Sequence, residues 1–246
     1  MSGRPDPGAG ARTGRPAEED RRAGDAATAL VRIDPMGEAA LLATLSDALD
    51  ARANAWALRA ARALEARRGG APGLGAAVPG HGSVLVPFDP DRCPEPIARA
   101  LLEQALGDAC ATEETPGGVL HEIPVAYGGA DGPDLGEVAA RTGLSADEVV
   151  ALHAGTEYRV LVLGFMPGFP YLGVLPPALD LPRRATPRVR VPAGSVAIAG
   201  RQTGIYPADT AGGWHLIGRT EVRPWDPRRD PPALLAPGDR VRFVPR

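Results

Sequence analysis

The chain has 246 residues and a formal net charge of -3, and all 27 of its basic residues are arginine. Because lysine is absent, a phosphate-binding P-loop, Schiff-base chemistry, biotin attachment and a Ser–Lys amidase are excluded for this chain acting alone. Its length accommodates one large domain or two of ordinary size, and we expect two.

The N-terminal residues 1–27 contain Gly, Pro, Arg and acidic residues with almost no large apolar side chain, which predicts a disordered leader. No apolar run of about 7–15 residues marks a signal peptide, and no stretch approaches the roughly 20 residues that span a bilayer. Cys93 and Cys110 lack metal-ligand spacing, so we expect free thiols in a cytoplasmic protein without membrane contact.

The next part of the chain predicts a small α+β domain over residues 28–115. We expect strands at residues 37–45, 76–79 and 83–88, with a tight turn between the last two, and helices at residues 46–68 and 94–106. With a further strand at residues 119–126, this order is typical of a ferredoxin-like unit.

A helical pair is predicted over residues 134–154, with Ser145 as the N-cap of its second helix. The pair resembles a helix-turn-helix. However, the second helix offers Asp147, Glu148 and one histidine where a DNA-reading helix needs cations and amides. We therefore expect ordinary surface helices and no nucleic-acid partner.

From Tyr158 onward the sequence is rich in Val, Ile and Leu runs interrupted by Gly and Pro, which predicts many short strands. Strands at this spacing favour a closed barrel, and we place the barrel domain at residues 116–246. Residues 180–246 carry 12 arginines and 6 acidic residues, so this part of the chain attracts an anion or presents a solvated basic face.

The segment LGFMPGFPYLG at residues 163–173 predicts a rigid loop that presents Pro167, Phe169 and Tyr171 for recognition. The alternative is that its aromatic side chains belong to the barrel core. Further along, Arg188 and Arg190 alternate with valines, so both arginines share one face of a strand and can clamp a carboxylate or phosphate. A solvent-facing strand edge has the same pattern.

The segments that follow Arg190 supply small residues, which let the backbone approach a ligand closely, and neutral hydrogen-bonding groups. These groups suit an amide or lactam ligand better than a metal. His215 is the one weak candidate for a general acid or base, and a structural histidine is the alternative. The remaining binding candidates are Gly194, Ser195, Gln202, Thr203, Tyr206, Trp214, His215 and Arg219.

Three segments, at residues 163–173, 185–207 and 212–220, together resemble the family of the 5-oxoprolinase B subunit, also known as the KipI or allophanate hydrolase subunit 1-like family. The resemblance implies a small α/β domain that is followed in the chain by a cyclophilin-like barrel. It also implies a complex with two partners, a homologous, biotin-dependent carboxyltransferase-like C subunit and a LamB/YcsF-like A subunit. Such a complex uses ATP to open 5-oxoproline to L-glutamate. No metal or biotin is expected on this chain.

The same resemblance leaves two alternatives open. One is an inhibitor of a sporulation-type histidine kinase, because the family includes such a protein. The other is a protein related to a component of allophanate hydrolase or urea amidolyase. Since neither Ser83 nor Ser195 lies in a G-x-S-x-G elbow, stand-alone amide hydrolysis has little chemical support.

Overall fold

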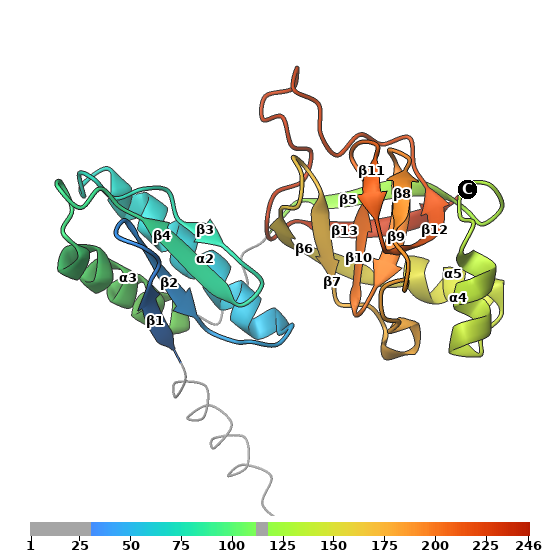
Figure 1. Ribbon diagram of the computed structural model, residues 1–246, viewed down its shortest axis with the longest axis horizontal. Coiled ribbons are helices and arrows are strands. Elements are labelled where there is room, and N and C mark those ends of the chain that lie inside the picture. The colour runs from blue at the N-terminus through green and yellow to red at the C-terminus, as the bar shows by residue number, and fades with distance from the viewer. Residues whose placement is uncertain (1–30, 112–117) are drawn as a thin grey trace, which may run out of the picture.

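The computed structural model describes residues 31–111 and 118–246, so the leader predicted at residues 1–27 lies outside the described residues. The described chain forms two groups of elements that lie side by side in Figure 1. We call residues 31–111 the N-terminal unit and residues 118–246 the barrel unit. None of the helices in these two ranges is both long and apolar enough to cross a membrane.

The N-terminal unit is a four-stranded antiparallel sheet in the order β1-β2-β4-β3, with two helices packed on it. Its elements are β1 (Arg32–Pro35), β2 (Ala40–Thr44), α2 (Ala51–Arg68), β3 (Val78–Pro79), β4 (Ser83–Pro87) and α3 (Glu95–Cys110). The Asp50 side chain caps α2 by accepting hydrogen bonds from the backbone N–H groups of Arg52 and Ala53. Alternate residues of β2 and β4 are buried under alanine and leucine side chains of both helices.

The predicted hairpin is confirmed as the β3–β4 pair, but the ferredoxin-like topology is not confirmed. The strand predicted at residues 119–126 pairs within the barrel and not with the N-terminal sheet. In its place the N-terminal sheet contains β1, which forms a hairpin with β2. The mixed α+β class and the closed barrel are as predicted.

The barrel unit closes seven strands in the order β10-β7-β6-β13-β5-β12-β9, and a two-stranded ribbon of β8 and β11 accompanies them. Its strands are β5 (Leu120–Tyr127), β6 (Glu157–Leu163), β7 (Pro170–Gly173), β8 (Arg188–Val191), β9 (Ser195–Ala199), β10 (Gln202–Ile205), β11 (Thr210–Gly212), β12 (His215–Arg219) and β13 (Arg240–Pro245). Its helices are α4 (Leu135–Thr142), α5 (Ala146–Ala154) and the short 3-10 helix η2 (Pro177–Leu179). The closed barrel fits the cyclophilin-like expectation.

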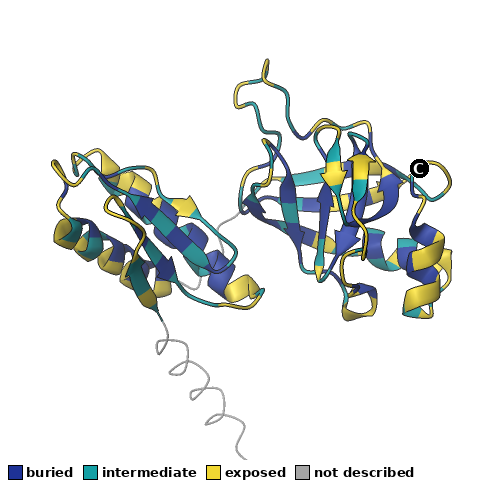
Figure 2. Cartoon of the chain, viewed as in Figure 1, coloured by how far each residue is buried: buried dark blue, intermediate teal, exposed yellow. Residues whose placement is uncertain are grey.

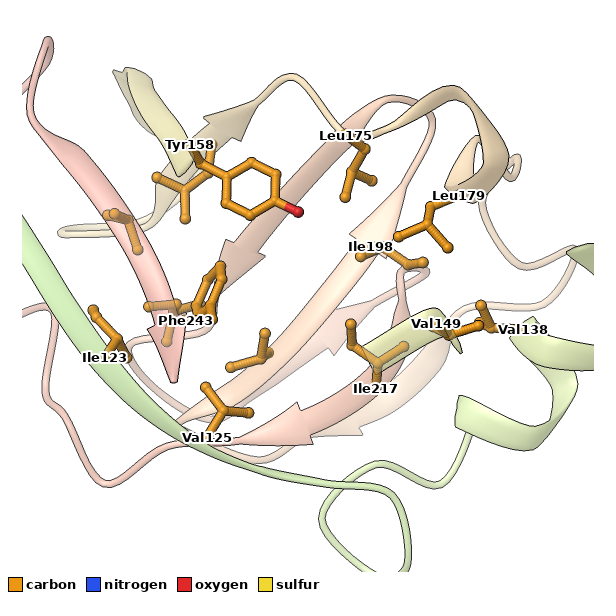
Figure 3. Close-up of a cluster of buried hydrophobic side chains, with 14 of the residues drawn as sticks. Ile123, Val125, Val138, Val149, Tyr158, Leu175, Leu179, Ile198, Ile217 and Phe243 are labelled. Atoms are coloured by element: carbon orange, nitrogen blue, oxygen red, sulfur yellow. The ribbon is translucent and has the colours of Figure 1, made fainter. Parts of the chain in front are cut away.

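The barrel core is formed by inward side chains of the strands together with α4, α5 and η2, and Figure 3 shows these side chains converging on one another. Figure 2 shows the outward faces of α4 and α5 exposed. The second helix of the predicted pair begins at a complete capping box, in which Ser145 and Glu148 bond each other's backbone N–H groups.

A fully buried histidine occupies the barrel interior. His153 of α5 stacks on Phe243 with ring centroids 4.6 Å apart. The Tyr127 hydroxyl donates to His153 Nδ1 at 2.7 Å, and His153 Nε2 donates at 2.9 Å to the Thr203 hydroxyl, which itself donates to the Ala197 carbonyl. Burial lowers the pKa of His153 to about 3, so the imidazole is neutral and both of its nitrogens are satisfied.

Candidate functional site

Aromatic side chains form a cluster on the outer side of the barrel wall. The Phe169 ring lies 5.0 Å from Tyr171, 5.1 Å from Tyr206 and 5.7 Å from Trp214, all edge to face. We call these four residues the aromatic cluster. Because successive residues of a strand point to opposite faces, Tyr171 joins this cluster while Leu172 points into the barrel core. Four of the predicted binding residues are therefore brought together, but Phe169, Tyr206 and Trp214 are buried, so the cluster is a small second core of the barrel unit and does not present Phe169 outward as predicted.

A cavity of about 460 Å³ borders the aromatic cluster where the two units meet. We call it the inter-unit pocket. Its lining comes from the N-terminal unit through Leu49 and from the barrel unit through Asp180, Pro182, Arg183, Ala199, Gly200, Arg201, Gln202 and Trp214. Its volume lies in the range of about 300–1,000 Å³ that is usual for small-molecule sites.

The N-terminal unit reaches the pocket wall through His81. The Gln202 side-chain amide donates to His81 Nε2 at 2.9 Å, and the His81 ring lies edge to face on Tyr171 with centroids 5.3 Å apart. Burial lowers the pKa of His81, which keeps the imidazole neutral and its Nε2 available as an acceptor. The Asn54 side-chain amide joins the units a second time by donating to the carbonyl groups of Gly80 and Leu161, each at 3.1 Å.

The segment that carries Arg183 is fixed to the barrel by backbone groups on either side of it. The Gly200 N–H donates to the Leu181 carbonyl at 2.6 Å, and the Arg184 N–H donates to the Gly213 carbonyl at 2.8 Å. Between them, His215 Nε2 donates to the Pro182 carbonyl at 3.0 Å. The arrangement therefore holds Arg183 at the pocket while its side chain remains exposed.

His215 itself is fully buried and makes no contact with a carboxylate in the described residues. Its Nε2 is committed to Pro182, and its Nδ1 has no partner among the described residues. A general base needs access to the proton that it removes. The geometry of His215 is that of a structural histidine, the alternative that the sequence left open.

Arg188 and Arg190 already bind carboxylates of this chain. Arg188 Nη2 donates to Asp134 at 2.6 Å, and Arg190 donates twice to Asp209, at 2.8 and 2.5 Å. Burial opposes ionisation of Asp134, but the bonds from Arg188 and from the Leu216 N–H outweigh it and lower its pKa. Both arginines that were expected to bind an external anion are therefore already paired with carboxylates of this chain, and neither lines the inter-unit pocket.

The remaining predicted residues lie elsewhere. Thr203 is inside the barrel with His153, Ser195 is buried at the start of β9, and Pro167 is exposed in its loop. Gly194 and Arg219 line a second and larger cavity of about 710 Å³ beside the end of β12. This second cavity lacks the aromatic cluster, so we take the inter-unit pocket as the candidate site.

Sequence reasoning missed three residues of the pocket lining, Leu49, Arg183 and Arg201, and also His81, which contacts the lining residue Gln202. Arg183 follows the proline-containing segment after η2, and Arg201 occupies the two-residue turn between β9 and β10. A signal existed for Arg201, because glycine followed by arginine between two apolar runs marks a hairpin tip. No local signal identified Leu49 or His81, which approach the site only through the tertiary fold.

The pocket offers an aromatic ring, a side-chain amide and cations, which bind and orient a small polar molecule. In residues 31–111 and 118–246 no group of three or more His, Cys, Asp or Glu side chains is placed to hold a metal ion. Around the pocket we find no nucleophile hydrogen-bonded to a base within the same described ranges. The geometry is therefore suited to binding and positioning.

The comparisons with known proteins agree with one another. The family model of the carboxyltransferase domain, subdomain C and D, matches residues 31–235. The 5-oxoprolinase B subunit of Escherichia coli O157:H7 is 52% identical over 177 residues, which are 71% of this chain and 79% of the relative. The 5-oxoprolinase B subunit of Bacillus subtilis (strain 168) is 37% identical over 227 residues, which are 88% of this chain and 93% of the relative.

Solved structures show the same likeness. The protein TTHA0988 is 44% identical with a TM-score of 0.73, and the match covers 85% of this chain and 40% of that one. The Kluyveromyces lactis urea amidolyase has a TM-score of 0.70 at 20% identity over 88% of this chain and 15% of that one, a likeness that shows the fold alone. These names do not favour the kinase-inhibitor or allophanate-related alternatives. The chain therefore belongs to the family of the 5-oxoprolinase B subunit, within the carboxyltransferase domain, subdomain C and D, family.

Proposed function

We propose that this chain is one component of an ATP-dependent 5-oxoprolinase, in which it binds and positions 5-oxoproline for cleavage to L-glutamate. The family membership and the names of its relatives support the reaction. The observation that carries the chain's own role is the inter-unit pocket, which combines the Trp214 ring and the Gln202 amide with arginine side chains. A lactam acid presents a ring, an amide and a carboxylate, so these groups match it.

The chemistry is shared with partner proteins in this proposal. The homologous C subunit completes the site and the A subunit contributes to the ATP-dependent opening, while ATP binds within the assembled complex. The complex acts in the cytoplasm, where the two free thiols of this chain stay reduced. We also retain the domain division at residues 28–115 and 116–246, because each described unit has its own hydrophobic core.

Reconstitution tests the proposed function. The three proteins from one organism are purified separately, mixed, and supplied with 5-oxoproline and ATP, and glutamate formation is followed over time. We expect turnover only when this chain is present. If the A and C subunits together turn over 5-oxoproline at the same rate without this chain, the proposed function is wrong.

A further inference from the structure

Two arginines of the inter-unit pocket form no ion pair within the part of the chain that the structure describes. Neither the Arg183 nor the Arg201 guanidinium forms an ion pair within residues 31–111 and 118–246. The neighbouring Arg184, by contrast, binds Asp134 and Glu137, each at 3.0 Å. The fold therefore pairs one arginine of this segment internally and leaves the adjacent one directed to the pocket.

Both unpaired arginines extend from backbone that is held in place. Arg201 sits in the tight turn that joins Ala199 to Gln202, where Gly200 adopts a φ of 55° that favours glycine. The backbone carbonyl of Arg201 accepts a hydrogen bond from the Leu175 N–H at 2.8 Å. Arg183 lies between the anchored carbonyl of Pro182 and the anchored N–H of Arg184, as described above. Fixed backbones reduce the entropy that each arginine loses when it binds an anion.

The pocket carries a suitable charge for a monoanion. Arg183 and Arg201 supply two positive charges and Asp180 supplies one negative charge, which leaves a surplus of one. A guanidinium binds a carboxylate through two parallel N–H bonds, so the arginines recognise this group in preference to a neutral one.

The Gln202 side of the pocket presents an oriented amide. Because its NH₂ group donates to the neutral His81 at 2.9 Å, the Gln202 carbonyl oxygen is the acceptor that remains for a ligand. An acceptor in this position suits the N–H of a lactam. Trp214, although largely buried, contributes apolar lining against which a ring can pack.

We propose that the inter-unit pocket binds a small monocarboxylate that also contains an amide, with Arg183 and Arg201 holding the carboxylate and Gln202 accepting from the amide N–H. His81 acts as a positioning residue by fixing the Gln202 side chain. This inference rests on the proposed function for one point only, the choice of 5-oxoproline as the ligand.

Isothermal titration calorimetry of the full chain tests the assignment with 5-oxoproline and two analogues. The analogues are 2-pyrrolidinone, which keeps the lactam ring without the carboxylate, and proline, which keeps the carboxylate without the ring carbonyl. We expect 5-oxoproline to bind and each analogue to bind at least about 10-fold more weakly. Arg183→Gln and Arg201→Gln should each weaken 5-oxoproline about 10- to 100-fold, since each removes a charge-assisted hydrogen bond.

Arg223→Gln is the matched control, because Arg223 is also exposed but lines the larger cavity. It should bind 5-oxoproline as the unaltered chain does, and circular dichroism should show that all variants are folded. Equal affinity of the Arg183 and Arg201 variants for 5-oxoproline would overturn the proposal, and so would equal affinity for 2-pyrrolidinone. Absence of 5-oxoproline binding both by the full chain and by the full chain mixed with the C subunit also overturns it, while the assignment of this chain to a 5-oxoprolinase still stands if reconstituted turnover needs it.

Discussion

The buried His153 makes the stability of the barrel depend on pH. It is fully buried, accepts from Tyr127, donates to Thr203 and stacks on Phe243. Replacing His153→Asn keeps an acceptor near the position of Nδ1 but removes the titrating ring. We expect a constant loss of about 2–4 kcal/mol in the free energy of unfolding, from the cavity and the lost hydrogen bond.

The pH dependence follows from the direction of the pKa shift. The folded pKa of about 3 lies below the ordinary value of 6.5, so the unfolded chain binds more protons than the folded chain between these two values. The free energy of unfolding therefore falls as the pH decreases through this window. Between about pH 7 and about pH 5, His153 accounts for a loss of about 2 kcal/mol.

Urea unfolding followed by circular dichroism at about pH 7 and about pH 5 measures this loss. The unaltered chain should lose about 2 kcal/mol more than the His153→Asn variant over this interval. Val149→Ala is the matched control, because Val149 is a fully buried residue of the same helix that does not titrate. It should lower stability at both pH values and keep the pH dependence. Equal pH dependence in the His153→Asn variant would refute the reasoning.

Three other substitutions test the structure. Asp134→Asn weakens the site where two arginines and the Leu216 N–H meet, so urea unfolding should show a loss of about 3 kcal/mol, and a loss below about 1 kcal/mol contradicts the buried ion pair. Gly194→Ala combines a φ of 81° with a Cβ that clashes with the Thr220 carbonyl oxygen, so the melting temperature should fall by several degrees, and an unchanged value contradicts the predicted strain. Asn54→Ala removes the hydrogen bond to the Leu161 carbonyl of the barrel unit and the bond to the Gly80 carbonyl within the N-terminal unit, so hydrogen exchange at β6 should accelerate. Unaltered exchange excludes a stabilising role for the Asn54–Leu161 hydrogen bond.

The local elements could be predicted from the sequence because their signals are local. Apolar spacing predicted the long helix at residues 46–68, observed as Ala51–Arg68, and Ser145 predicted the start of α5. The partner of each strand could not be predicted in this way. The strand at residues 119–126 looked like the last strand of the N-terminal domain, whereas its neighbours β12 and β13 lie about a hundred residues further along the chain.

The candidate site was partly predictable for the same reason. Aromatic residues beside proline and glycine, together with Gln202 and Trp214, predict a recognition surface. The fold brings them together, but Phe169 and Tyr206 are buried, and only Gln202 and Trp214 line the pocket. An arginine carries no sequence mark that separates a paired side chain from an unpaired one. The alternating pattern points to Arg188, which Asp134, 54 residues away, neutralises, and no pattern points to Arg183, which lines the pocket.

The parallel pairing of β5 with β13 has a consequence for how the protein folds. Leu120 pairs with Arg240, and β13 also pairs with β6, so one strand from the far end of the barrel unit completes two ladders at once. Contacts between such distant segments close large loops and slow folding. During synthesis, β5 and β6 keep unpaired edges until residues 240–245 have emerged, and open strand edges invite aggregation. A chain truncated before β13 should therefore accumulate in inclusion bodies.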